Sequence, residues 1–282
     1  MKDLVLFGDC RKTLPAFIDE ARMCVTSPPY YGLRDYGGEE SQIGMEQSPE
    51  EYIQQLVEVF RLVRDNLTDD GTLWVNIGDS YYNYRSDGNY PKQTVSKTRQ
   101  DLPTKTPVRG NKLEGYKSKD LIGIPWLLAF ALRKDGWYLR QDIIWNKPNP
   151  MPESVRDRCT KSHEYIFLLS KSKNYYFDVD SIKESTIDGK GLKRKKSVWT
   201  VNTKPYKGTH FATFPPELIE PCIKSGSQKG DIILDPFMGS GTTGMVSKSL
   251  GRYYIGCELH ESYGKLIQNR VSQYTINLED FV

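Results

Sequence analysis

Residues 230–243 read Gly230-Asp-Ile-Ile-Leu-Asp235-Pro-Phe-Met-Gly239-Ser-Gly241-Thr-Thr243, and this segment is the clearest indication of the fold class. An apolar run ends in an acid, which is followed by a glycine-rich turn and then by a helical pattern. Glycines let the backbone approach a ligand closely, and a helix N-terminus favours anionic groups. We therefore expect a strand, a ligand-binding loop and a helix, the repeating unit of an α/β protein.

An acid that follows the next predicted strand indicates which type of ligand the loop binds. Glu258 follows the strand 253–257 and lies 23 residues after Asp235. A carboxylate at about that spacing is placed to bind ribose hydroxyls. No Lys precedes Thr242 or Thr243, so a phosphate-binding P-loop is excluded, and the Gly-x-Gly-x-x-Gly spacing of NAD sites is absent. A tight structural turn without a ligand is the alternative interpretation.

A second loop carries residues suited to chemistry on an amine. The predicted strand 23–26 runs into Ser27-Pro28-Pro29-Tyr30, where two prolines end the strand and stiffen the backbone. The lone pair of an exocyclic base amine is delocalised into its ring. Hydrogen bonds from the amine to the Ser27 side chain and the Pro28 carbonyl would draw it toward sp³ geometry, while Tyr30 stacks on the flipped base. Alternatively, this is a proline-terminated strand with a core tyrosine.

Two basic segments predict a polyanionic partner. The net charge is only +3, but residues 84–119 hold nine Lys and Arg against three Asp and Glu, and residues 189–207 hold seven Lys and Arg and no acid. Cations for phosphates combined with rings for stacking suit nucleic acid, although solvated loops are the alternative. The aromatic residues of the two segments are Tyr84, Tyr90, Tyr116, Trp199 and Tyr206.

Composition excludes several other classes of protein. Of the 282 residues 38% are hydrophobic and 27% charged, so the chain is expected to be globular. The longest apolar stretch, residues 124–132, is shorter than the roughly 20 residues of a membrane helix. No signal-peptide layout, Cys-x-x-Cys pair or ligand-like histidine spacing is present, so we expect a cytoplasmic protein without a membrane segment, disulfide framework or metal site.

Strand and helix patterns alternate along the chain and predict one α/β domain, residues 1–282, with a mostly parallel sheet and helices on both faces. Ser48, Pro49 and Glu51 form the clearest helix start. The expected strands are 4–7, 23–26, 72–77, 138–145, 165–169, 231–234 and 253–257. The expected helices are the one starting at 49 and those over 11–20, 121–134, 216–225, 242–250 and 261–274.

Taken together, the Thr-Ser-Pro-Pro-Tyr loop and the Asp-Pro-Phe-Met-Gly-Ser-Gly-Thr-Thr loop, in this order, resemble the permuted (β-group) amino-methyltransferases of DNA, which use S-adenosylmethionine. The similarity spans nearly the whole chain and implies a Rossmann-like methyltransferase fold. It implies that Asp9 contacts the cofactor's adenine, Glu258 its ribose, and the segment 210–215 its methionine part. Residues 145–150 and 163–167 resemble later motifs of the catalytic part. The cofactor-binding residues implied are Asp9, Thr213, Phe214, Asp235, Pro236, Phe237, Gly239, Ser240, Gly241, Thr242, Thr243 and Glu258.

The loop also bears on the target base. Ser-Pro-Pro-Tyr is more typical of N4-cytosine enzymes, whereas Asp-Pro-Pro-Tyr or Asn-Pro-Pro-Tyr is more typical of N6-adenine enzymes. We therefore expect methylation of cytosine N4 in double-stranded DNA by base flipping and direct transfer, with N6-adenine as the alternative. C5 methylation needs a Pro-Cys loop, but Pro221-Cys222 lies within a predicted helix, where Cys222 is expected to pack in the core.

Different classes of function stay open at this point. One is a non-catalytic nucleic-acid-binding protein on the same scaffold, and another is methylation of RNA or of a protein glutamine. The resemblance further implies a restriction–modification context with a cognate endonuclease, and a homodimer. Three residues have two interpretations: Asp9 binds cofactor or caps a helix, Asp79 neighbours the active site or does not, and Trp199 anchors its loop in the core or stacks on a base.

Overall fold

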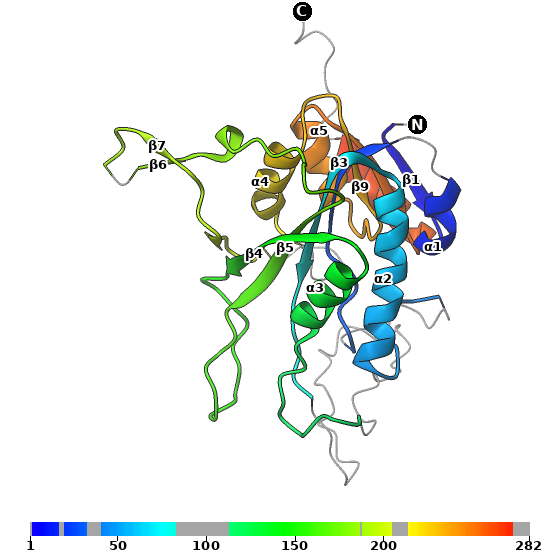
Figure 1. Ribbon diagram of the computed structural model, residues 1–282, viewed down its shortest axis with the longest axis vertical. Helices are drawn as coiled ribbons and strands as arrows, with labels where there is room; N and C mark the ends of the chain where they lie inside the picture. The colour runs from blue at the N-terminus through cyan, green and yellow to red at the C-terminus, as the bar shows by residue number, and fades with distance from the viewer. Residues whose placement is uncertain are drawn as a thin grey trace, which may run out of the picture.

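The computed structural model describes residues 2–16, 20–32, 41–82, 113–186, 188–204 and 214–272. Figure 1 shows a central sheet with helices on both sides. The strands are β1 (Leu4–Phe7), β2 (Ala21–Thr26), β3 (Leu67–Ile77), β4 (Tyr138–Asn146), β5 (His163–Ser170), β6 (Glu184–Ser185), β7 (Leu192–Lys193), β8 (Val198–Thr200), β9 (Ile232–Asp235) and β10 (Tyr253–Glu258). The α-helices are α1 (Cys10–Thr13), α2 (Pro49–Asp65), α3 (Ile124–Lys134), α4 (Pro216–Gly226), α5 (Thr242–Ser249) and α6 (Gly264–Ser272).

Within the described ranges, the main sheet has eight strands in the order β1-β10-β9-β2-β3-β5-β4-β8. The strands from β1 to β3 are parallel to their neighbours, β5 is antiparallel to both β3 and β4, and β8 is parallel to β4. The predicted α/β class with a mostly parallel sheet is therefore confirmed. β6 and β7 form a separate two-stranded ribbon that projects from the body (Figure 1).

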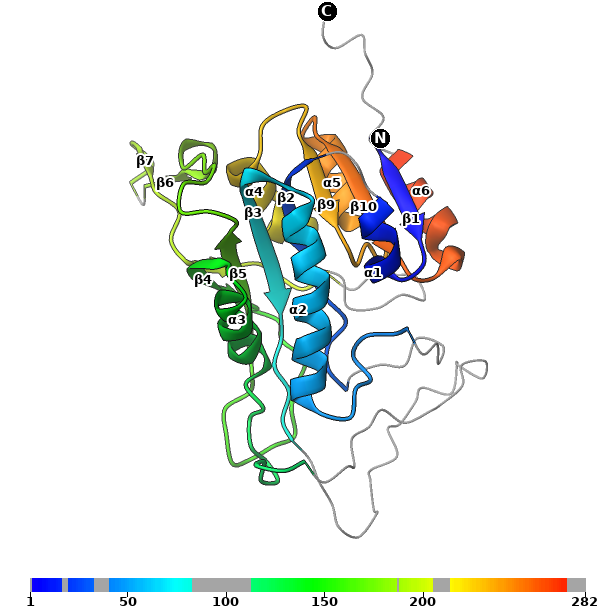
Figure 2. The ribbon, with the colours of Figure 1, turned by 45° about the vertical axis from the view of Figure 1, so that its right-hand side comes forward.

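Alternating side chains along the strands divide the core into two layers. On β3, Leu73, Val75 and Ile77 belong to the cluster built with α2 and α3, whereas Trp74 belongs to the cluster built with α4. This alternation is the two-residue period of a strand with both faces covered. Figure 2 shows α2 and α3 in front of the sheet and α4 and α5 behind it.

Local sequence explains where the helices begin. The Ser48 hydroxyl accepts a hydrogen bond from the Glu51 N–H (3.2 Å), and Pro49 takes the first helical position of α2, as predicted. At α3, the Asp79 carboxylate accepts from the N–H groups of Gly123 and Ile124. Because Gly123 precedes the first turn, α3 starts at Ile124 rather than at the predicted Leu121, and Asp79 stabilises that start.

The helix predicted over residues 11–20 was wrong in length. α1 ends at Thr13 and is followed by a 3₁₀ turn, Leu14–Ala16. Pro15 has no N–H to donate to the preceding turn, which explains why the α-helical pattern stops there. The short strands β6, β7 and β8 were not predicted. None of the described helices is long and apolar enough to cross a membrane.

Candidate active site

The two loops singled out in the sequence follow adjacent parallel strands. β2 pairs with β9 through Met23 opposite Ile233 and Cys24 opposite Leu234. From this pair the chain moves outward in opposite directions, from β2 to β3 through α2 and from β9 to β10 through α5. Such a reversal opens a crevice at the carboxyl ends of the strands, where α/β proteins bind ligands.

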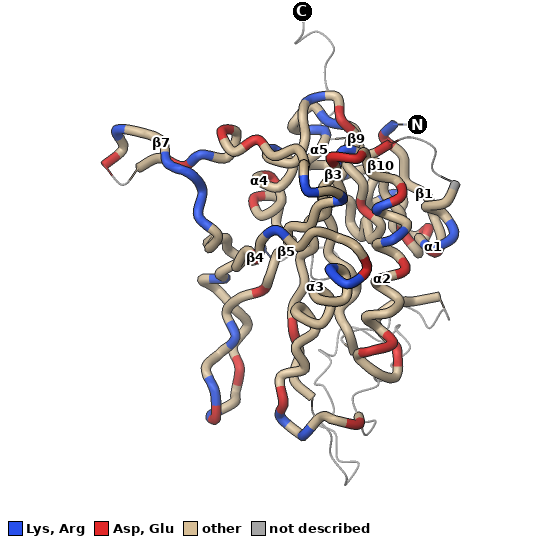
Figure 3. Tube along the Cα trace, in the orientation of Figure 1, with Lys and Arg blue, Asp and Glu red and all other residues tan. Residues whose placement is uncertain are grey.

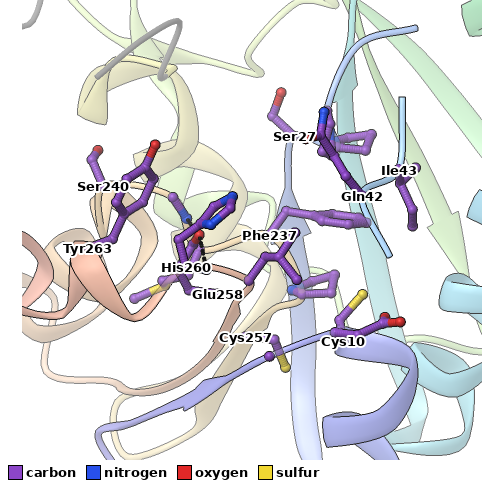
Figure 4. A pocket seen from close by; sticks show the side chains of 18 of the residues that line it. Cys10, Ser27, Gln42, Ile43, Phe237, Ser240, Cys257, Glu258, His260 and Tyr263 are labelled. Carbon is purple, nitrogen blue, oxygen red and sulfur yellow. Dashed lines mark hydrogen bonds between the residues drawn. The ribbon is translucent and has the colours of Figure 1, made fainter. Parts of the chain in front are cut away.

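A single cavity joins the two loops at this point. Figure 4 shows Ser27, Gln42 and Ile43 on one side of it and Ser240, His260 and Tyr263 on the other, with Phe237 between them. The loop of residues 27–30, called the catalytic loop below after its expected role, and the glycine-rich loop therefore face the same space. The cavity is lined by Gly8, Asp9, Cys10, Ser27, Pro28, Pro29, Tyr30, Ser41, Gln42, Ile43, Phe214, Pro236, Phe237, Met238, Gly239, Ser240, Thr242, Cys257, Glu258, Leu259, His260 and Tyr263.

The Asp235 carboxylate connects the end of β2, just before Ser27, with the glycine-rich loop by hydrogen bonds. Its carboxylate accepts from the hydroxyls of Thr26 and Thr243, each at 2.6 Å, and from the Phe237 N–H at 3.0 Å. Complete burial raises the pKa of Asp235 to about 6, although these hydrogen bonds oppose the shift. Asp235 does not line the cavity, so its role in this structure is to fix the catalytic loop against the N-terminus of α5.

Glu258, at the end of β10, does line the cavity. Its two carboxylate oxygens accept from the backbone N–H groups of Gly239 (2.8 Å) and His260 (3.0 Å). Burial raises the pKa of Glu258 to about 7, with the two N–H groups opposing it and Asp235 adding to it. The carboxylate thus ties the glycine-rich loop to β10 and still reaches the cavity, as a ribose-binding acid requires.

Asp9 caps a helix and also lies at the cavity. Its side chain accepts from the Arg11 N–H at the N-cap of α1 and from the Arg11 guanidinium, and it also lines the cavity. Partial burial acts to raise the pKa of this carboxyl, but the hydrogen bonds and charge of Arg11 outweigh it and lower the pKa. Asp9 is therefore a preoriented anion at the cavity edge.

The catalytic loop is fixed from both faces of the sheet. The Tyr52 hydroxyl on α2 donates to the Pro29 carbonyl at 2.8 Å, and the Tyr30 hydroxyl donates to Glu164 on β5 at 2.7 Å. Burial, reinforced by the charge of Glu164, raises the pKa of Tyr30 well above its ordinary value, so the phenol stays protonated. Ser27, Pro28, Pro29 and Tyr30 all line the cavity.

Most of the predicted site residues meet in this cavity, but not all. Asp235, Gly241 and Thr243 do not line it, and Thr213 falls outside the described residues. Ser41, Gln42 and Ile43 were missed, because no motif marks them. Their position follows from the chain returning over the catalytic loop, where the Gly32 N–H donates to the Gly44 carbonyl (2.8 Å). His260 and Tyr263 were also missed, although their nearness to Glu258 was the available signal.

Two polar side-chain atoms at the cavity could bind a nucleoside cofactor that has an amino-acid end. Thr242 Oγ1, at the first turn of α5, and His260 Nε2, beside Glu258, are buried without a hydrogen-bond partner among the described residues. Buried polar atoms are otherwise almost always paired. A carboxylate at the start of α5 and polar atoms beside Glu258 would satisfy them, so the residues present fit S-adenosylmethionine.

The second basic segment leaves the body at the β8 edge of the sheet. We call its described part, residues 189–204, the basic arm. Figure 3 shows Lys and Arg along this arm next to β7. Lys190, Arg194 and Lys196 are exposed, whereas Lys195 pairs with Glu184. Residues 84–112 and 205–207 of the two basic segments lie outside the described residues.

Comparison with known proteins agrees with this geometry. The N6_N4_Mtase family, described as DNA methylase, matches residues 21–269, and the chain belongs to this family. It is similar to the type II methyltransferase M.SmaI of Serratia marcescens, with 51% identity over 273 residues that cover 95% of this chain and 90% of that one. It is also 51% identical over 257 residues to the type II methyltransferase M.Cfr9I of Citrobacter freundii, which covers 91% and 83% of the two chains.

Solved structures share the fold at lower identity. PvuII DNA methyltransferase (cytosine-N4-specific) matches with a TM-score of 0.69 and 18% identity, over 99% of this chain and 88% of that one. The complex of M1.HpyAVI with S-adenosylmethionine matches with a TM-score of 0.59 and 18% identity, over 94% and 98% of the chains. Together with the family match and the 51% identical relatives, this shows that the chain is a DNA methyltransferase of the class that uses S-adenosylmethionine, as the two loops predicted.

Proposed function

We propose that this enzyme methylates the exocyclic N4 of cytosine in duplex DNA, after flipping the base into the cavity described above. The observation that carries the proposal is the position of Ser27, Pro28 and Tyr30 in the same cavity as Asp9 and Glu258. A flipped base held by the first group would present its amine toward a cofactor held by the second. Such positioning is the main contribution of an enzyme to a direct transfer.

The residues have separate tasks in this reaction. When bound, S-adenosylmethionine supplies an electrophilic methyl group. Ser27 and the Pro28 carbonyl accept hydrogen bonds from the target amine and make its lone pair available, while the Tyr30 ring holds the base by stacking. No nucleophile of the chain is needed, which agrees with the burial of Cys222 inside α4. The transfer is direct and forms no covalent enzyme intermediate.

The test is identification of the methylated base. Unmethylated DNA is incubated with labelled S-adenosylmethionine, digested to nucleosides and analysed by mass spectrometry. N4-methylcytosine is the expected product. N6-methyladenine would overturn the assignment of the base but would leave the proposed roles of the two loops unchanged. Tyr30→Ala, which removes the stacking ring, is expected to lose turnover and to bind S-adenosylmethionine nearly as well as the wild type. Full activity of this variant would contradict the stacking role.

Recognition of a specific site is proposed for the two basic segments, 84–119 and 189–207, through phosphate contacts and groove readout. The similarity to type II methyltransferases supports a restriction–modification context with a cognate endonuclease, and DNA as substrate supports a cytoplasmic location. A homodimer is supported by the outer face of α3, where Leu127 and Phe130 are 37% and 48% exposed. Sedimentation of the wild type against Phe130→Glu tests the dimer, which the charge should weaken.

A further inference from the structure

The segment between β4 and β5, residues 147–162, extends from the same edge of the sheet as the catalytic loop. β3 is parallel to β2 and ends at that edge. β5 is antiparallel to β3, with Ile77 opposite Tyr165, and β4 is antiparallel to β5, with Asn146 opposite His163. β4 therefore ends, and β5 begins, at the edge where β2 leads into the catalytic loop. We call this segment the β4–β5 loop, and Figure 1 shows it as the green loop that extends downward from β4 and β5.

Contacts at the base of the β4–β5 loop join it to the catalytic loop. The Tyr30 hydroxyl donates to Glu164, the second residue of β5, at 2.7 Å. Glu164 also forms an ion pair with Lys147, the first residue of the loop, whose N–H donates to the Ser162 carbonyl at 2.7 Å. Met151 lies four residues after Lys147, so the Cα atoms of these two residues are within roughly 14 Å of each other. The loop thus starts beside the tyrosine that is expected to hold the flipped base.

The β4–β5 loop also contacts both basic segments. Asn149 exchanges hydrogen bonds with Thr203 of the basic arm: its side-chain amide donates to the Thr203 carbonyl at 3.1 Å, and the Thr203 N–H donates to its side-chain oxygen at 2.9 Å. Lys119, the last residue of the first basic segment, forms an ion pair with Asp157 at 2.6 Å. The loop is therefore connected to the two segments for which DNA binding is proposed.

Met151 extends into solvent from a stiff part of this loop. Its side chain is 84% exposed, more than any other large apolar side chain of the described ranges. Pro150 and Pro152 flank it, and the ring of Pro152 restricts Met151 to an extended backbone. The next residue, Glu153, is fixed by the Arg158 guanidinium, which donates to it at 2.6 Å. Single exposed apolar residues are common on protein surfaces, so it is the position of Met151 that suggests a function.

The duplex must approach this edge of the sheet, because the target base has to reach the catalytic loop there. Flipping a base requires that its pairing and stacking are broken and leaves a gap in the helix. Proteins that distort DNA insert apolar side chains, Met among them, between the bases. An unbranched side chain on an extended, proline-stiffened backbone has a suitable shape for this gap, and exposed Arg156 of the same loop supplies a cation for the phosphates.

We propose that Met151 enters the gap that the flipped base leaves in the duplex, and that the β4–β5 loop carries it there. This inference rests on the proposed flipping of the target base and adds the neighbouring base pairs to the contacts of the enzyme. Met151 does not touch the reacting amine. Its side chain packs between the neighbouring bases, and this contact stabilises the DNA with the target base outside the helix.

A duplex in which flipping costs less tests the inference. After the methylated position has been mapped, two duplexes are prepared, one fully paired and one with an abasic site opposite the target base. Single-turnover methylation of the paired duplex by Met151→Ala is expected to be roughly tenfold slower than by the wild type, because the flipped state loses its stabilising contact. On the abasic duplex the two proteins should react at nearly equal rates, since no base pair has to be broken. Met151→Leu, which keeps a large apolar side chain, should retain most of the wild-type rate.

Tyr138→Ala is the matched control. Tyr138 begins β4 at the opposite edge of the sheet and is 45% exposed, so this change removes exposed apolar surface away from the catalytic loop. Its rates should equal those of the wild type on both duplexes. The Kd for S-adenosylmethionine and the melting temperature should stay near wild type in Met151→Ala, because the side chain is almost fully exposed.

The outcomes separate this inference from the proposed function. A wild-type rate of Met151→Ala on the paired duplex, or equal losses on both duplexes, would overturn the role of Met151 even if the wild type produces N4-methylcytosine. A change in the sedimentation of free Met151→Ala, combined with equal losses, would instead place Met151 in a contact between two copies of the chain. If the wild type methylates adenine, the assignment of the base fails, while the comparison of the two duplexes still decides on Met151.

Discussion

The Glu258 carboxyl group is buried, which disfavours its ionised form, although two backbone N–H groups donate to it. Its pKa is about 7 in the folded chain against 4.5 ordinarily, so the folded state holds this proton more tightly than the unfolded state. Its contribution to the free energy of unfolding is therefore fully present below pH 4.5 and is lost as the pH rises through 7, about 3 kcal/mol in all. Glu258→Gln should flatten this part of the stability profile, as urea unfolding at pH 5 and pH 8 would measure.

Cofactor binding should have the opposite dependence on pH. Ribose hydroxyls donate best to the ionised carboxylate, so wild-type affinity for S-adenosylmethionine should rise about tenfold from pH 6 to pH 8. Calorimetric titration of Glu258→Gln over the same range should show weaker binding with little change. An equal rise in the variant would mean that another group titrates. Burial also raises the pKa of Asp235 to about 6. Because Asp235 is present in both proteins, its titration contributes to both binding curves, and the difference between the curves reports Glu258 alone.

The positions of some site residues could be predicted from the sequence, whereas the contacts of others could not. Ser27, Tyr30, Asp9 and Glu258 could be placed because each follows a strand pattern at the same edge of a parallel sheet. Asp235 was placed in the right loop, but its contacts with Thr26 and Thr243 depend on the pairing of β2 with β9. Asp79 has a structural role, because it caps α3. Trp199 is buried on β8, as the interpretation that it anchors its loop in the core predicted.

At the scale of elements, α2 stabilises both a layer of the core and the catalytic loop. The Tyr52 hydroxyl crosses from α2 to the Pro29 carbonyl and so limits the orientation of the loop. Tyr52→Phe should lower kcat about fivefold, the equivalent of one ordinary hydrogen bond. Ser48→Ala is the control on the same helix: loss of the cap should lower stability by about 1 kcal/mol without a change in kcat. Equal kcat losses in both variants would point to general loosening of α2.

Long, regular elements could be predicted from sequence, whereas short ones could not. The strands β1, β9 and β10 agree with their predicted ranges to within a residue or so, because buried apolar runs bounded by turns are distinctive. β6, β7 and β8 have two or three residues each, too few to show a period. The hydrogen bond between Tyr30 and Glu164 escaped prediction for a different reason: the two residues meet only through the strand order β2-β3-β5, which no local pattern contains.

At the scale of the whole molecule, the basic arm gives a salt-dependent prediction. Arg194→Ala and Lys196→Ala should weaken binding to all DNA sequences alike, and each should reduce the slope of log K against log salt by about 0.9 if it removes one phosphate contact. Fluorescence anisotropy from 50 to 300 mM salt measures the slope. Lys224→Ala, which removes a paired lysine of α4, should leave it unchanged. A loss confined to one DNA sequence would instead indicate base readout by the arm.

The pairing of β1 with β10 also has a consequence for biosynthesis. Leu4 lies opposite Ile255, so β1 finds its partner strand only after about 250 further residues have been synthesised. Asp9 and Glu258, the acids at the ends of these two strands, can therefore face one cavity only after synthesis has passed residue 258. A polypeptide interrupted before that point contains Ser27 and Tyr30 but lacks Glu258 and its side of the cavity. We therefore expect fragments that end before β10 to be inactive as methyltransferases.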